Sequence, residues 1–131
     1  MDTRCKILSR ESALENACRA KQQGRKLTVV TGYFDVLSAG HVRGLKDVRN
    51  STADHVLMVV LLPPPEPVLP ARARAELVAS LSMVDYVVTE TESSVEEFIE
   101  QLPADEVISQ QTADETQTRL LVEHVLVRYS Q

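Results

Sequence analysis

Two short apolar runs constrain the fold of this chain more than any other feature. Residues 27–31 and 56–62 are rich in valine, leucine and threonine and carry no charged side chain. Runs of this length are short for a helix, and a strand that lacks polar alternation is one that is buried on both faces. The sequence therefore predicts two central strands of a parallel sheet.

Segments with apolar residues at helical spacing separate these runs, and two further short strands follow. Helices are expected at 9–23, after the turn at 38–40, from 70 onward, at 95–102 and at 113–129, and the further strands at 84–89 and 106–109. Strands that alternate with helices form right-handed crossovers. We expect one α/β domain over residues 1–131, with a Rossmann-like parallel sheet of four to five strands and helices on both faces.

Several residues predict how the helices begin and end. Ser9 is a suitable N-cap for the first helix, and Gly24 is a suitable stop. Ser94 and Glu97 have the spacing of a capping box. In the helix that follows the proline at position 70, Leu77 is expected to face inward.

Composition argues against several classes of partner. Fourteen basic and 19 acidic residues give a net charge of −5, and aromatic residues make up only 4% of the chain. Nucleic-acid binding needs clustered cations or stacking rings, so we expect none. The run at 56–62 is too short to span a membrane. Cys5 and Cys18 lack the spacing of a zinc site, and together with the absence of a signal peptide they predict a cytoplasmic chain without a protein-bound metal.

The turn after the first strand, residues 31–41, is the candidate ligand site. Ligands of such sheets bind beyond the carboxyl ends of the strands. Gly32 allows backbone to approach a ligand closely, and Gly40 and His41 open a helix whose free N–H groups and dipole attract phosphate. A turn with only a structural role would contain the same residues.

Residues 31–35 (Thr-Gly-Tyr-Phe-Asp) and 40–45 (Gly-His-Val-Arg-Gly-Leu) resemble the signature of the cytidylyltransferase-like nucleotidyltransferases, a family marked by a His-x-Gly-His motif. Within this family the chain resembles the adenylyltransferase domain of ADP-heptose synthase (HldE type) and, nearby, glycerol-3-phosphate cytidylyltransferase. The resemblance continues through residues 70–77, 84–88 and 102–105. It implies the α/β fold predicted above.

The resemblance also implies an activity and a set of site residues. A sugar or alcohol phosphate would attack the α-phosphate of ATP or CTP, with Mg²⁺ bound through the triphosphate, and pyrophosphate would leave. Asp35 would fix the loop, and His41 would stabilise charge on the phosphates. The residues implied to bind the nucleotide are Gly32, Tyr33, Phe34, Asp35, Gly40, Arg74, Thr116, Thr118 and Arg119.

The sequence departs from the family pattern around this one site. Ser38 replaces the first motif histidine, and a serine cannot carry positive charge. Loss of one preorganised donor from such a site costs roughly 10²–10³ in rate. A proline-rich stretch at 63–67 replaces a polar and basic loop, and residues 109–111 (Ser-Gln-Gln) replace a Lys-Gly-Gly stretch. The helix and fifth strand that follow in the family are expected to be missing.

Other polar residues have simpler interpretations. His55 and the acidic residues between 90 and 100 are expected on solvated surfaces, although Glu90 and Glu92 would bind a cation if they converged with Asp85. Arg74 is as well suited to pairing with Glu76 on the helix surface as to contacting phosphate. A solvated helix start would equally explain the threonines and the arginine between 116 and 119.

Two functions therefore stay open. The first is a shortened nucleotidyltransferase. The second is a non-catalytic nucleotide-binding or protein-interaction module that keeps the fold, with homodimerisation as one way to cover the shortened sheet. A phospho-receiver domain is disfavoured, because the sequence has no acidic pair after the first strand and no phospho-acceptor aspartate at a later strand end.

Overall fold

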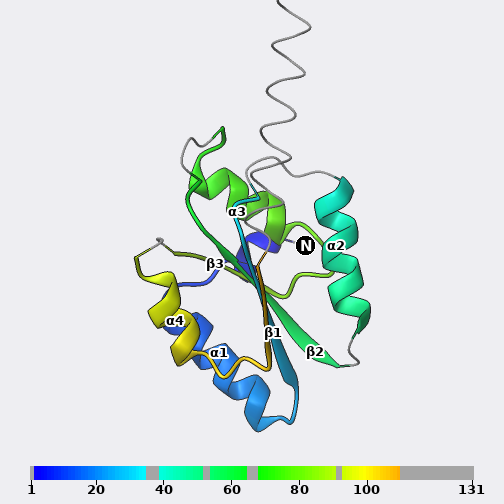
Figure 1. The fold of residues 1–131 in the computed structure, drawn as a ribbon, viewed down its shortest axis with the longest axis vertical. Helices are drawn as coiled ribbons and strands as arrows, with labels where there is room; N and C mark the ends of the chain where they lie inside the picture. Colours follow the sequence, from blue (N-terminus) through cyan, green and yellow to red (C-terminus); the bar gives the residue numbers. More distant parts are fainter. Residues whose placement is uncertain (1, 35–38, 52–53, 65–67, 91–92, 110–131) are drawn as a thin grey trace, which may run out of the picture.

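A computed structural model describes residues 2–34, 39–51, 54–64, 68–90 and 93–109 (Figure 1). Helices and strands alternate through these residues as the sequence predicts. In chain order they are η1 (Thr3–Lys6), α1 (Arg10–Gln22), β1 (Lys26–Gly32), α2 (Ala39–Ser51), β2 (His55–Leu61), α3 (Ala71–Ala79), β3 (Tyr86–Thr89), α4 (Val95–Gln101) and β4 (Glu106–Ser109). The helix predicted at 113–129 lies outside the described residues, as does most of the proline-rich stretch.

The described strands form one parallel sheet in the order β3-β2-β1-β4. Strand β1 pairs with β2 along its whole length and with β4 over residues 28–31. The chain builds outward from β1 through β2 to β3, and then returns to the other side of β1. The sheet order therefore reverses between β1 and β4, and in open α/β sheets such a reversal is where ligands bind.

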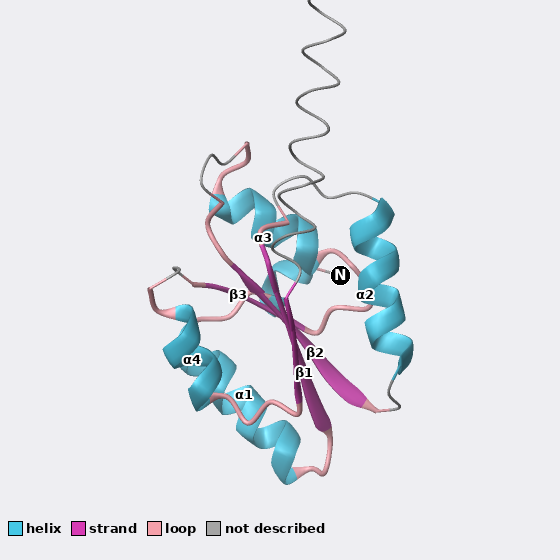
Figure 2. Ribbon diagram, in the orientation of Figure 1, coloured by secondary structure: helices cyan, strands magenta, loops and turns pink. Residues whose placement is uncertain are grey.

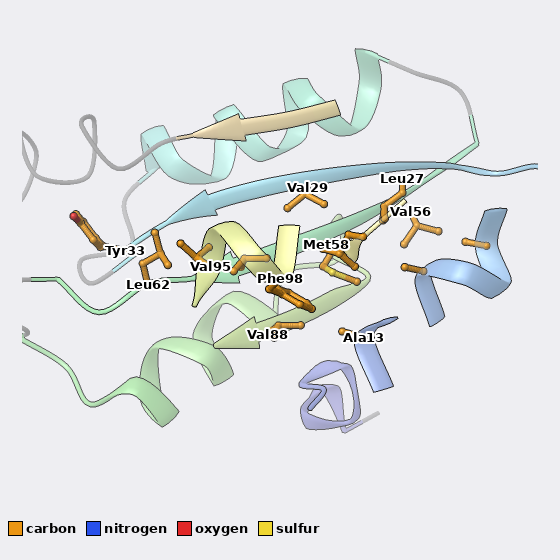
Figure 3. Close-up of a cluster of buried hydrophobic side chains, with 14 residues drawn as sticks. Ala13, Leu27, Val29, Tyr33, Val56, Met58, Leu62, Val88, Val95 and Phe98 are labelled. Carbon is orange, nitrogen blue, oxygen red and sulfur yellow. The ribbon is translucent and has the colours of Figure 1, made fainter. Parts of the chain in front are cut away.

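Helices cover both faces of the sheet, which confirms the predicted fold class (Figure 2). On one face Val29 and Met58 pack with Ala17 of α1 and Phe98 of α4 (Figure 3). On the other face the next residue of β1, Val30, packs in a cluster with side chains of α2 and α3. Successive residues of a strand point to opposite faces, so both faces of β1 are buried, as its uninterrupted apolar run predicts.

The first helix begins and ends as predicted. The Ser9 hydroxyl accepts a hydrogen bond from the Ser12 N–H at 3.2 Å, and Gly24 follows the helix at φ +77°. The predicted capping box of α4 is wrong. Ser94 makes no side-chain cap bond, because its hydroxyl donates instead to the Glu90 carboxylate.

The inward face of α3 differs from the prediction. Leu77 is 41% exposed, whereas Arg74 is only 4% exposed. Arg74 shares its buried stripe with Ala75, Val78 and Ala79, a stripe rotated away from Leu77. A hydrophobicity pattern cannot assign a guanidinium to the core, and this is why the prediction failed here.

A buried polar network joins the amino ends of the strands, and it corrects the prediction that His55 is solvated. The His55 ring is 1% exposed and lies 3.0 Å both from the Thr28 hydroxyl and from the Arg49 carbonyl oxygen. A carbonyl only accepts, so Nε2 carries a proton, and in the neutral ring Nδ1 is then the acceptor for the Thr28 hydroxyl. Arg49 also donates to Asp85 at 2.6 Å.

Asp85 directly precedes β3 and Glu90 directly follows it, so the two carboxylates lie at opposite ends of the strand and do not form a cation site.

None of the described helices combines the length and the apolar character needed to cross a bilayer.

Asp105 provides a test of how the helix layer is attached to the sheet. Its Oδ2 accepts from Lys21 of α1 at 2.8 Å and from the Leu27 N–H of β1 at 2.7 Å. The Lys21 ammonium, and then the Leu27 N–H, hold the pKa of Asp105 below its ordinary value of 3.8. The unfolded chain binds the proton more readily, so this contribution to stability is present above the ordinary value and is lost as the pH falls through the lowered one.

We therefore predict that Asp105→Asn lowers the free energy of unfolding at pH 7, and that the deficit disappears below the lowered pKa. Urea unfolding between pH 2 and pH 7 measures both quantities. Glu106→Gln is the control, because the Glu106 side chain, unlike its backbone in the β1–β4 ladder, makes no hydrogen bond or ion pair with the described residues. A deficit that stays constant with pH would contradict the assignment.

Candidate functional site

The candidate site begins where β1 ends. Gly32 is the last residue of the strand, and Tyr33 and Phe34 continue it into the turn that precedes α2. Tyr33 is 6% exposed and Phe34 is fully buried. The turn therefore starts from the carboxyl end of the central strand, at the edge of the sheet where its order reverses.

Phe34 has an unusual backbone conformation. Its φ is +49°, in the left-handed region that bulky residues rarely adopt. Its ring is fully buried in the cluster that also contains Leu45 of α2 and Val78 of α3. Such strain persists only where the surrounding packing enforces it, and it occurs most often at functional sites.

His41, in the first turn of α2, lies against this strained residue. The His41 side chain is 4% exposed, and its ring centroid is 5.2 Å from that of Phe34, with the planes inclined by 49°. The structure thus brings together two residues that the sequence predicts for one site. Gly40 lies beside them in the same turn of α2.

Arg74 reaches the same turn from α3. Its Nη1 donates to the carbonyl oxygens of Tyr33 at 3.1 Å and of Leu62 at 2.9 Å. Its buried Nε has no hydrogen-bond partner among the described residues. The expected pairing of Arg74 with Glu76 is wrong, because Glu76 pairs with the exposed Arg72 at 3.0 Å.

A cavity of about 280 Å³ opens next to Arg74, beyond the carboxyl ends of β2 and β3. Its lining consists of Leu61, Pro63, Ala71, Arg74, Thr89 and Glu90. Glu90 is not a solvated residue as predicted: its side chain is 7% exposed, and Oε1 lies 3.9 Å from Arg10 Nε. Its position directly after a strand is the sequence signal that would have assigned it to this site.

Several predicted site residues lie outside the described residues. They are Asp35, Ser38, Thr116, Thr118 and Arg119. Within the ranges that the structure describes, no three His, Cys, Asp or Glu side chains converge in a way that could hold a metal ion.

The strain at Phe34 leads to a prediction about stability. In most buried positions alanine is more stable than glycine by about 0.5–1 kcal/mol. At a φ of +49° alanine adds a left-handed penalty of about 1–2 kcal/mol that glycine avoids. We expect Phe34→Gly to be at least as stable as Phe34→Ala, although both lose the buried ring.

Denaturant unfolding of the two variants measures this difference. Phe98, which is equally buried but lies within α4, is the matched control. There the alanine variant should be the more stable of the pair. If the alanine variant is the more stable of the pair at residue 34 as well as at residue 98, residue 34 is unstrained in solution.

Comparison with known proteins identifies the family of this chain. The cytidylyltransferase-like family model matches residues 29–128. The bifunctional protein HldE of Edwardsiella ictaluri is 30% identical over 112 residues, which cover 79% of this chain and 23% of that protein. HldE of Gluconacetobacter diazotrophicus is 32% identical over 110 residues, covering 78% and 22%. HldE of Acidiphilium cryptum is 35% identical over 91 residues, covering 63% and 18%.

The chain spans less than a quarter of the length of these HldE relatives. The family match begins within β1 and includes the turn at its carboxyl end, the start of α2, and α3. The residues that form the candidate site are therefore part of the matched region. By its sequence and its four-stranded parallel sheet, the chain belongs to the cytidylyltransferase-like family.

Proposed function

We propose that this chain binds ATP or CTP, as its magnesium complex, at the carboxyl end of β1, and that it is a nucleotidyltransferase whose catalysis is impaired or lost. The observation that carries the proposal is the contact between Phe34 and His41 at the point where the sheet order reverses. Membership of the cytidylyltransferase-like family supports the class of reaction.

The binding step follows from the geometry of the turn. The backbone of Gly32, Tyr33 and Phe34 borders the nucleotide, and the N-terminus of the 13-residue helix α2 faces its phosphates. Free N–H groups and the helix dipole favour an anion there. His41, in the first turn of the same helix, donates to a phosphate oxygen, and its contact with Phe34 limits where its ring can lie.

The transfer step needs no covalent intermediate with the protein. A phosphate oxygen of the acceptor forms a bond to the α-phosphorus, and the bond from that phosphorus to the bridging oxygen breaks. Pyrophosphate leaves with the electron pair, and the metal ion that accompanied the triphosphate neutralises part of its charge. The protein supplies alignment and positive charge. We place the body of the acceptor, a sugar or alcohol phosphate, in the cavity beside Thr89 and Glu90.

Ser38 is the reason to propose impaired catalysis. Its hydroxyl donates one neutral hydrogen bond where the family has a histidine, and bonds from charged donors are about twice as strong. Binding needs fewer donors than transfer does. Serine at position 38 therefore also supports the second candidate function, a module that keeps the fold and the nucleotide site but does not catalyse the transfer.

Calorimetric titration with Mg·ATP and Mg·CTP tests the binding step. We expect one of the two to bind and His41→Ala to weaken that binding roughly ten- to hundredfold, the value of a hydrogen bond to a charged group. Asn50→Ala, an exposed change at the far end of α2, should leave the affinity unchanged. Failure of both nucleotides to bind at millimolar concentration would remove the proposal.

Restoring the motif histidine tests the account of catalysis. Ser38→His should raise the rate of pyrophosphate release, with glycerol 3-phosphate or heptose 1-phosphate as acceptor, by at least roughly 10²-fold. A coupled pyrophosphate assay on the parent chain and the variant measures the ratio. An unchanged rate in a variant that binds nucleotide normally would mean that the missing histidine is not what limits turnover.

A further inference from the structure

Arg74 joins α3 to the turn after β1 by a side-chain hydrogen bond, in addition to the apolar packing of α3 against Phe34. The two carbonyls that it contacts each lie one residue beyond the paired ends of β1 and β2, which stop at Gly32 and Leu61. Both residues are almost fully buried. The guanidinium therefore donates hydrogen bonds to the carbonyl oxygens that lie just beyond the last β1–β2 pair. These bonds hold the segments that follow β1 and β2 in a fixed orientation to each other.

The contact to Tyr33 also fixes the residue that follows. A peptide unit is planar, so holding the Tyr33 carbonyl sets the direction of the Phe34 N–H in the same plane. Phe34 then takes its φ of +49°, and its ring meets the His41 ring at 5.2 Å. The Arg74 guanidinium is thus connected to the His41 ring through its hydrogen bond to the Tyr33 carbonyl, the Tyr33–Phe34 peptide and the contact between the two rings.

Direct contact of Arg74 with the nucleotide is a poorer use of this side chain. Nη1 already donates to two buried carbonyls, and releasing one of them would leave a buried acceptor without its hydrogen bond. The guanidinium is 4% exposed, and its Nε–H has no hydrogen-bond partner among the described residues. An arginine with an unpaired buried donor is a costly way to fill a core, so stability alone does not account for it.

We propose that Arg74 is a positioning residue: it orients the Tyr33–Phe34 peptide and so holds the His41 ring in place, without touching the nucleotide itself. The consequence for nucleotide affinity rests on the proposed function. The effect on the His41 ring does not, because it is a property of the chain without ligand.

The test reads the His41 ring directly. Proton NMR of the free protein should show His41 imidazole signals displaced by the ring current of Phe34, assigned by their loss in His41→Gln. Arg74→Met should move these signals toward those of an unstructured histidine. Arg72→Met, on the same helix but paired on its exposed face with Glu76, should leave them unchanged.

A second control separates positioning from general loss of stability. Val56→Ala opens a cavity in the cluster on the opposite face of the sheet, and it should lower stability without removing either carbonyl contact or the packing around Phe34. It should leave the His41 signals in place. If Arg74→Met does not fold, Arg74→Gln is measured instead, because its shorter amide cannot reach both carbonyls. His41 signals that match the parent chain in a folded Arg74 variant would overturn the proposal.

Nucleotide binding provides an independent readout. Where the parent chain binds Mg·ATP or Mg·CTP, Arg74→Met should weaken binding by a factor similar to that of His41→Ala, and the double variant should be little weaker than either. If the affinity of the double variant falls by the product of the two single factors, Arg74 acts separately from His41, which would contradict the proposal. Absence of binding by the parent chain would refute the proposed function and leave the NMR result to decide the role of Arg74.

Discussion

The pairing of β1 on both sides is the constraint on which the rest of this structure depends. Its residues pair with β2 from Lys26 to Gly32 and with β4 over residues 28–31, so both edges of the strand are hydrogen-bonded and both faces are covered. The carboxyl end of such a strand is fixed from every direction. A turn that starts there can place a ligand-binding group with little freedom, and the chain uses it to carry Phe34 and, through the contact of the two rings, His41.

The two ends of the sheet differ in how well their polar groups are satisfied. At the amino end, the buried His55 ring bonds to the Thr28 hydroxyl and to the Arg49 carbonyl, and the half-buried side chains of Arg49 and Asp85 form an ion pair. The carboxyl end carries the left-handed Phe34 and a cavity, and the buried Arg74 Nε there has no partner among the described residues. Strain and unpaired donors are costly, and packing elsewhere in the domain offsets them. Asp54, directly before β2, also has a positive φ of +50°, so the unpaired buried donor and the cavity are the features that set the carboxyl end apart.

Much of the fold follows from the sequence, because the signals for it are local. The apolar runs gave β1 and β2 to within a residue at each end, and Ser9 and Gly24 marked the ends of the first helix correctly. The errors concern polar side chains whose partners are distant in the chain. The side chains of Arg74 and His55 can be buried because carbonyl and hydroxyl groups of other elements hydrogen-bond to them. Ser94 bonds to Glu90 instead of capping its helix. The resemblance to the family assigned His41 and the turn before it to the candidate site, but no pattern in the sequence indicated the left-handed backbone conformation of Phe34.

The central claim is that nucleotide binds at the carboxyl end of β1. The most direct measurement is a titration of the isotopically labelled chain with Mg·ATP and Mg·CTP, followed by backbone amide shifts in two-dimensional NMR. We expect the largest shifts at residues 32–34 and in the first turn of α2, while the amino ends of the strands around His55 stay unchanged. Shifts that centre instead on the outer face of α1, or none at all, would contradict it.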